Sequence, residues 1–496
     1  MTTLIDTVGN EAPRREAAPG VPRSRAPSPT PSTPVSLYKS REQIYPKLAK
    51  GPFRNLKWLA MIVLLGIYYG LPWVRWDRGP GQPDQAVLVD FENARFYFFF
   101  IEIWPQEVYY ITGLLILAAL GLFLVTSLFG RVWCGYACPQ TIWTDLFIHV
   151  ERFFEGDRNA RIKLDRARWS VSKLYKKTAK HVVWLLIALF TGGAWILYFH
   201  DAPTIARDFF TGHAPSTSYI FAALLTFTTY SLAGFMREQV CTYMCPWPRI
   251  QAALIDEDAL NVTYRYDRGE PRGPHKKGAS WEGRGDCIDC RQCVAVCPVG
   301  IDIRDGLQLE CIGCALCIDA CNGIMEKVDR PKGLIAYDTD ANVVRRMAGL
   351  PARYRLVRAR TVIYAVVFAG VGFIMLFALL GRSTLDLNVV RDRQPNFVRM
   401  SDGSVQNGYT VKVMNKATEP RRLELSALGL PSPALNVAGQ AGLTLDVPAD
   451  ETMDFRVTVL EDELAEIGER GEFTFQLTHV ESGTVATRET VFVAGP

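Results

Sequence analysis

Twelve cysteines are the residues of this sequence whose spacing points most clearly to chemistry, because all of them stand in regular motifs. Eight form two copies of the pattern C-x2-C-x2-C-x3-C, at Cys287, Cys290, Cys293 and Cys297 and again at Cys311, Cys314, Cys317 and Cys321. This spacing binds [4Fe–4S] clusters in pairs, since three thiolates of one tight loop hold one cluster and the fourth cysteine ligates the other. We therefore predict one cluster on Cys287, Cys290, Cys293 and Cys321, and a second on Cys311, Cys314, Cys317 and Cys297.

Structural zinc is the alternative for these eight cysteines. Zinc sites use C-x2-C pairs that are separated by longer gaps, which the doubled pattern does not match. Pro298 follows the fourth cysteine of the first copy and fits the start of a helix. Asn322 takes that position in the second copy, and the difference is harmless because proline is not a ligand. Gly313 suits a backbone that wraps closely around a cluster.

The other four cysteines form two copies of C-x3-C-P, at Cys134, Cys138 and Pro139 and at Cys241, Cys245 and Pro246. Each pair follows an apolar segment by a few residues, and on a helix positions i and i+4 share a face. Proline after the second cysteine should end or kink the helix. We predict that Cys134, Cys138, Cys241 and Cys245 converge on one metal site, because soft thiolates suit Cu(I), zinc or an iron–sulfur cluster. Two unconnected pairs of structural thiols are the alternative.

Five segments have about the ~20 residues needed to cross a bilayer. They are Trp58–Val74, Val108–Phe129, Val182–Phe199, Ser218–Phe235 and Thr361–Leu380. The first and fourth are the weakest by length and polarity, and a buried or re-entrant helix is their alternative. Loop 131–180 holds eleven basic residues against five acidic ones, which places it in the cytoplasm. The N-terminus and the cysteine-rich segment 236–360 are then cytoplasmic, and the C-terminus lies outside.

The chain divides into five regions by composition. Residues 1–50 are rich in Pro, Ser, Arg and Ala, and we predict a disordered tail. Alternating apolar residues after position 385, such as Tyr409, Val411 and Val413, predict several short strands of a β-sandwich. The aromatic segment 95–107 suits a membrane-interface belt. The predicted regions are the tail (1–50), a four-span membrane domain with both C-x3-C-P motifs (51–250), a cytoplasmic 2[4Fe–4S] domain (251–350), a fifth span (351–384) and an exported β-sandwich (385–496).

The combination of these motifs resembles the CcoG/FixG/RdxA family of membrane-bound polyferredoxins. The resemblance rests on both C-x3-C-P motifs, the doubled cysteine pattern, and the stretches FYFFFIEIWPQE, YRYDRGEPRG and PVGIDIR. It implies a bacterial inner-membrane protein with an inserted ferredoxin-like domain and an immunoglobulin-like C-terminal domain. It also implies a role in making cbb3-type cytochrome oxidase, as a cupric reductase that turns Cu(II) into Cu(I). Copper ions and copper chaperones or oxidase assembly factors are the partners that this role implies.

Two other functions fit the same residues. The chain could relay electrons between a quinol or a soluble donor and a partner reductase, with copper irrelevant, or its clusters could be structural parts of an assembly scaffold. No G-x-G-x-x-G opening a βαβ unit and no P-loop occurs, so direct binding of NAD(P)H or ATP is not expected. No nucleic-acid-binding motif occurs either.

Overall fold

The computed structural model describes residues 43–79, 81–276, 278–464 and 467–495. Most of the predicted disordered tail lies outside these residues. Its last part does not, because Tyr45 donates a hydrogen bond to Asp165 (2.8 Å) and the Lys47 amide donates one to the carbonyl of Ala295 (2.8 Å). Residues 45–50 are therefore attached to the rest of the chain, and the prediction of a free tail up to residue 50 is wrong for them.

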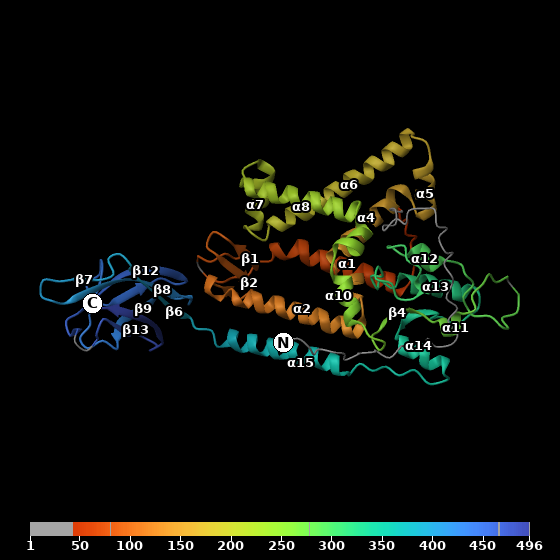
Figure 1. Ribbon diagram of the computed structural model, residues 1–496. Coiled ribbons are helices and arrows are strands. Elements are labelled where there is room, and N and C mark those ends of the chain that lie inside the picture. Colours follow the sequence, from red (N-terminus) through yellow and green to blue (C-terminus); the bar gives the residue numbers. More distant parts are fainter. Residues whose placement is uncertain (1–42, 80, 277, 465–466, 496) are drawn as a thin grey trace, which may run out of the picture. The chain divides into compact units, whose positions relative to one another are not determined.

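Five long helices correspond to the five predicted spans, α1 (Pro52–Gly70), α2 (Tyr109–Phe129), α6 (Val171–Ile196), α8 (Ser216–Gly234) and α15 (Ala359–Leu380). In the part of the chain that the structure describes, four helices are long and apolar enough to cross a membrane by themselves. The fourth predicted span qualifies only when α8 is joined to the short helical turns after it, from which it is bent by 97°. The helix α15 packs along α2, as Figure 1 shows.

Two spans begin earlier than their apolar runs indicate. Helix α6 starts at Val171, eleven residues before the predicted start, because Ser170 caps it by accepting a hydrogen bond from the Lys173 amide (3.2 Å). Such a serine cap satisfies an amide that would otherwise lack a partner. Helix α1 starts at Pro52, and no side chain of its own N-terminus caps it. Its cap comes from elsewhere in the chain, as described below.

Shorter helices connect these spans and fill the cysteine-rich segment. They are α3 (Val132–Tyr136), α4 (Pro139–Glu155), α5 (Arg158–Arg166), α7 (Ala202–Thr211), α9 (Arg237–Gln239), α10 (Trp247–Leu254), α11 (Tyr266–Gly269), α12 (Gln292–Val296), α13 (Leu316–Lys327) and α14 (Asp340–Met347). The strands β4 (Asn261–Tyr264) and β5 (Ile335–Asp338) pair antiparallel. Because they lie before and after the eight cysteines in the sequence, this pair closes the cluster-binding segment at its base.

The segment between α1 and α2 folds into a small antiparallel sheet that the sequence analysis missed. Its strands are β1 (Val87–Asp90), β2 (Arg95–Phe98) and β3 (Ile101–Ile103), in that order. Tyr97 and Trp104 are buried, while Phe98, Phe99 and Phe100 are exposed. The Arg95 guanidinium lies 4.0 Å from the centre of the Trp104 ring. Only part of the aromatic segment is therefore available for a membrane interface.

The C-terminal region is a two-sheet β-sandwich, as predicted. One sheet has the strand order β10-β12-β8-β6, with β7 paired to β8, and the other has the order β11-β9-β13-β14. The predicted inward residues Tyr409, Val411 and Val413 are all buried. The strands are β6 (Leu385–Arg391), β7 (Val398–Arg399), β8 (Val405–Asn415), β9 (Arg421–Leu428), β10 (Ala434–Val437), β11 (Thr444–Val447), β12 (Glu451–Glu461), β13 (Arg470–His479) and β14 (Val485–Val493).

Replacing Phe475 by alanine should destabilise the sandwich by about 3–5 kcal/mol, because this fully buried ring fills the space between the two sheets. The exposed Leu428 on β9 provides a matched control, and Leu428→Ala should cost less than about 1 kcal/mol. Calorimetric unfolding of the detergent-solubilised chain measures both. Equal shifts of the unfolding transition in the two variants would show that Phe475 is not part of the core.

Candidate iron–sulfur and thiol sites

The two C-x2-C-x2-C loops have the same backbone conformation at equivalent positions. In the first loop, Asp289 and Arg291 flank the middle cysteine with φ angles of 54° and 53°. In the second loop, Gly313 and Ala315 occupy the same places with φ angles of 66° and 60°. Left-handed backbone is uncommon for residues other than glycine and is found where a function requires it. Both loops therefore wrap their cysteines around an enclosed space in the same way.

One cavity is lined by Cys287, Cys290, Cys293 and Cys321, which we call the first cysteine set. Three of these residues come from the first loop and the fourth from α13. Tyr264 of β4 and Arg304 also line the cavity. Cys290 is the one exposed cysteine among the twelve, all of which the structure describes. This set is therefore nearer the protein surface than the others.

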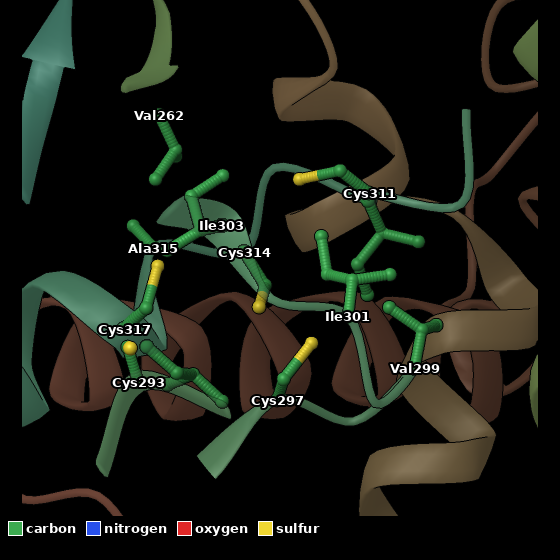
Figure 2. Close-up of a pocket in the computed structure, with 12 residues that line it drawn as sticks. Val262, Cys293, Cys297, Val299, Ile301, Ile303, Cys311, Cys314, Ala315 and Cys317 are labelled. Carbon is green, nitrogen blue, oxygen red and sulfur yellow. The ribbon is translucent and has the colours of Figure 1, made fainter. Parts of the chain in front are cut away.

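A second cavity is lined by Cys297, Cys311, Cys314 and Cys317, which we call the second cysteine set. Figure 2 shows the sulfurs of Cys297 and Cys314 turned toward the same space, with apolar side chains such as Ile301 and Ile303 around them. Cys293 of the first set also lines this cavity. The two cavities are therefore neighbours.

The chemistry of these cysteines fits iron–sulfur clusters. Burial raises the pKa of Cys293 and Cys311 to about 11 and that of Cys297 and Cys321 to about 12. Backbone amides oppose this effect by donating hydrogen bonds to sulfur, for example that of Gly313 to Cys311 and that of Ile335 to Cys321. Such bonds stabilise a thiolate ligand. In the described residues, no three His, Cys, Asp or Glu side chains are placed to hold a single metal ion.

The two C-x3-C-P motifs do not form the helical faces that we predicted. In the first motif Cys134 lies in α3, but Cys138 stands outside it as the extended N-cap of α4, with ψ at 127°. In the second motif Cys241 lies in the π-helical turn η3 (Val240–Met244), and Cys245 follows it with ψ at 123°. The proline after each second cysteine disfavours helical backbone at that cysteine. The prediction that each pair shares one helical face is therefore wrong, whereas the predicted break at proline is confirmed.

A reciprocal exchange of helices brings the two motifs together. Helix α4, which follows the first motif, packs on α6 and α8, whereas α10, which follows the second motif, packs on α2 (Figure 1). Phe147 of α4 stacks on Trp184 of α6 at 5.1 Å, and Trp247 of α10 stacks on Phe123 of α2 at 5.8 Å. Because each motif precedes a helix that packs on the other half, the two chain segments meet at the motifs.

The four thiols of these motifs lie near one another, and we call them the four-thiol region. Cys134 interacts electrostatically with Cys138 and Cys241, and Cys241 also interacts with Cys245. Burial raises the pKa of Cys134 to about 12 and that of Cys241 to about 11. The Cys134 thiol donates a hydrogen bond to the side-chain oxygen of the fully buried Gln251 on α10 (3.4 Å). The four thiols are not placed for a single ion, as noted above for all described residues.

The four-thiol region is in direct contact with the second cysteine set. Cys134 and Cys241 pack against a small buried cluster that includes Cys314. Gly135 lies so close that an added Cβ atom would stand 2.9 Å from the Cα atom of Cys314. Tyr136 donates a hydrogen bond to the carbonyl of Cys314 (3.2 Å). The motif residues between Cys134 and Cys138 therefore dock the cluster loop, a role that the cysteine spacing alone did not indicate.

Asp319 attaches the cluster-binding helix α13 to the first long helix. Its buried carboxylate accepts hydrogen bonds from the amides of Phe53 (3.4 Å) and Arg54 (2.8 Å), at the start of α1. It is the cap that α1 lacks in its own sequence. Since Asp319 stands between Cys317 and Cys321, one side chain ties both cysteine sets to the membrane domain.

Three protein-family models match parts of the chain. A "4Fe-4S dicluster domain" matches residues 236–340, a "4Fe-4S binding domain" matches residues 111–157, and an "IG-like fold at C-terminal of FixG" matches residues 375–495. The first match covers both cysteine sets and the second C-x3-C-P motif. The second match covers the first C-x3-C-P motif.

Full-length relatives have similar sequences. The nitrogen fixation protein FixG of Rhizobium meliloti (strain 1021) is 53% identical over 456 residues, which cover 85% of this chain and 87% of the relative. The proteins RdxB and RdxA of Cereibacter sphaeroides are 53% and 52% identical, over 86% and 84% of this chain and 90% and 88% of theirs. A solved FixG-related protein from Vibrio parahaemolyticus is 23% identical and covers 23% of this chain and 97% of its own, with a TM-score of 0.21.

Replacing Gly135 by alanine should loosen the second cysteine set, because the new methyl group would push the backbone of Cys314 away. We expect iron content to fall by up to about half, since one of two [4Fe–4S] sites is affected. Gly66 in α1 has open space around its Cα atom, so Gly66→Ala is the matched control and should keep its iron. Iron and acid-labile sulfide analysis of both variants measures this loss. Full iron content in Gly135→Ala would show that this close contact is not needed.

Proposed function

Because this chain belongs to the family of FixG, RdxA and RdxB, we propose that it is a membrane-bound iron–sulfur protein that reduces Cu(II) to Cu(I) for the assembly of cbb3-type cytochrome oxidase. One observation carries the proposal. The four-thiol region packs directly on the loop of the second cysteine set. A site with soft ligands for Cu(I) therefore adjoins a site that suits a one-electron cofactor.

The first and second cysteine sets are the proposed ligands of the two [4Fe–4S] clusters. Each cavity is lined by the four cysteines that the sequence pattern assigns to it. When bound, each cluster supplies or accepts one electron at a time. The contacts follow a consistent order, from the exposed Cys290 through Cys293, which lines both cavities, to Cys314 and then Cys134. Electrons from a cytoplasmic or quinol donor would enter near Cys290 and reach the four-thiol region at Cys134.

Copper is the proposed substrate at the four-thiol region. Reduction of each Cu(II) to Cu(I) consumes one electron, and thiolates stabilise the product because Cu(I) is a soft ion. Cys134 would give up its proton and its hydrogen bond to Gln251 when it binds the ion. Because the thiols are not placed for one ion, copper would have to draw Cys134, Cys138, Cys241 and Cys245 together. The bend at each proline leaves the second cysteine outside a helix, which allows such movement.

An electron relay without copper is the second candidate. The arrangement of the four thiols favours it, because they are not placed for a single ion. In that case a partner reductase would take the electrons, and the thiol pairs would serve to dock the cluster loop. Reduction of Cu(II) by the purified protein separates the two functions.

The double replacement of Cys138 and Cys245 by serine should abolish Cu(II) reduction, because each half of the four-thiol region loses a soft ligand. About eight irons and eight acid-labile sulfides per chain should remain, since both residues lie outside the two cysteine sets. A Cu(I) chelator assay and metal analysis measure both quantities. Met244 next to Cys245 is exposed, and Met244→Leu is the control that tests whether its thioether takes part. Unchanged reduction in the serine variant would remove the four-thiol region from the reaction.

The proposed location is the bacterial inner membrane, with the cysteine sets in the cytoplasm and the β-sandwich in the periplasm. The basic loop 131–180 supports this orientation. Copper chaperones or oxidase assembly factors would then meet the sandwich outside and the thiols inside. A phosphatase reporter that is active only in the periplasm should work when fused after Val493 and fail after Ala348. The opposite result would reverse the topology.

A further inference from the structure

Arg131 is a buried cation at the junction of the second cysteine set and the four-thiol region. It is the N-cap residue of α3 and is 3% exposed. One guanidinium nitrogen donates hydrogen bonds to the carbonyls of Gln308 (3.0 Å), Leu309 and Cys311 (3.0 Å). The second terminal nitrogen of the guanidinium donates a hydrogen bond to the carbonyl of Pro248 (3.3 Å). The side chain therefore ties the cluster loop to the chain segment after the second C-x3-C-P motif.

The charge of this guanidinium is not neutralised by an ion pair. Within the described part of the chain, no carboxylate lies at ion-pair distance from Arg131, and its Nε atom is buried without a partner. Its electrostatic partners are the thiols of Cys311 and Cys134 and, as the weakest of the three, the carboxylate of Glu310. The positive charge is therefore almost completely shielded from solvent, and it interacts with the sulfurs of Cys311 and Cys134.

The first cysteine set has a different electrostatic environment. Its cavity is lined by Arg304, whose side chain is 4% exposed, but this guanidinium forms ion pairs with Asp302 (2.6 Å) and with Asp289. Arg291, which is exposed, also lines this cavity and lies 3.8 Å from Asp289. Two carboxylates thus pair with two cations, and neither guanidinium is left unpaired. The two sets have the same cysteine spacing and loop conformation, yet only the second has an unpaired buried cation in the described residues.

We propose that Arg131 raises the reduction potential of the cluster held by the second cysteine set above that of the cluster held by the first. Gaining an electron makes a thiolate-ligated cluster more negative, and net charge and solvent exposure set its potential. A buried cation stabilises the reduced form strongly, because the surrounding dielectric constant is low. Arg131 therefore favours residence of the electron on the second set, which adjoins Cys134. Arg131 acts through its charge on the cluster of the second cysteine set, and it does not touch the substrate.

This inference rests on the cluster ligands of the proposed function, and its test does not involve copper. The readout is the midpoint potential of each cluster, from potentiometric titration of the full-length solubilised protein followed by EPR. Arg131→Met and Arg131→Gln remove the charge, and glutamine keeps a donor for one carbonyl. Both should lower one midpoint and leave the other unchanged. Arg131→Lys keeps the charge and should keep both midpoints close to those of the unmodified protein.

Arg360 provides the matched control. It also donates to backbone carbonyls, of Leu254 (3.0 Å) and Ala253 (3.4 Å), but it lies outside both cavities. Arg360→Met should move neither midpoint. Adding Cys290→Ser perturbs the first cluster alone and so assigns each EPR signal to its set.

Three results would overturn the proposal. The first is a pair of unchanged midpoints in the neutral variants that keep their iron. The second is a lysine variant whose midpoint falls as far as that of the methionine variant. The third applies if the neutral variants lose one cluster, and it is loss of the same cluster from Arg131→Lys. If Arg131→Lys keeps both clusters, the charge of residue 131 has the proposed role. Fewer than two clusters in the unmodified protein would instead contradict the proposed function.

Discussion

The close approach of two backbones at Gly135 and Cys314 is the constraint on which the rest of the site depends. An ordinary side chain at position 135 would not fit, because its Cβ atom would stand 2.9 Å from the Cα atom of Cys314. The membrane helices and the cluster-binding segment can therefore meet without an intervening layer of side chains. Electron tunnelling weakens with distance, so this contact matters for function as well as for packing.

Buried polar contacts hold the cluster-binding segment against the membrane helices. Asp319 caps α1 from the cluster-binding helix, and Arg131 binds the carbonyls of the loop around Cys311. Within the membrane domain, Glu151 of α4 accepts a hydrogen bond from Arg237 (2.8 Å), which lies a few residues before Cys241. These groups are buried, and a buried charge that loses its partner is costly. The same contacts that position the cysteines therefore also make partial undocking of the cluster segment unfavourable.

The two cysteine sets and the β-sandwich could be predicted from the sequence, whereas the contact between the C-x3-C-P motifs and the cluster loop could not. The spacing of the eight cysteines predicted both sets, because three ligands of each set lie on one local loop and the fourth follows the other loop at a fixed spacing. The alternation around Tyr409 predicted the sandwich for the same local reason. By contrast, the helical face assumed for Cys134 and Cys138 was wrong, since the proline after Cys138 extends the backbone there. The small sheet around Tyr97 was also missed, because aromatic residues are common both in strands and at membrane interfaces.

Residues that act across long sequence separations could not be predicted from local patterns. Asp319 lies 265 residues from Arg54, whose amide it caps. A hint was available, because α1 begins with glycine and proline and has no capping side chain of its own. Arg131 likewise contacts a loop that is about 180 residues away. In the sequence, Arg131 is one of eleven basic residues in the loop 131–180, and only the fold shows that it lies beside Cys311 and Cys134.

In the proposed function, electrons held at the two cysteine sets reduce copper at the adjoining thiols. Rapid mixing of the chemically reduced, full-length protein with Cu(II), followed by freeze-quench EPR and Cu(I) chelation, tests it most directly. We expect the reduced cluster signals to disappear while one Cu(I) forms for each electron lost. Cluster signals that persist beside unreduced Cu(II) would contradict it.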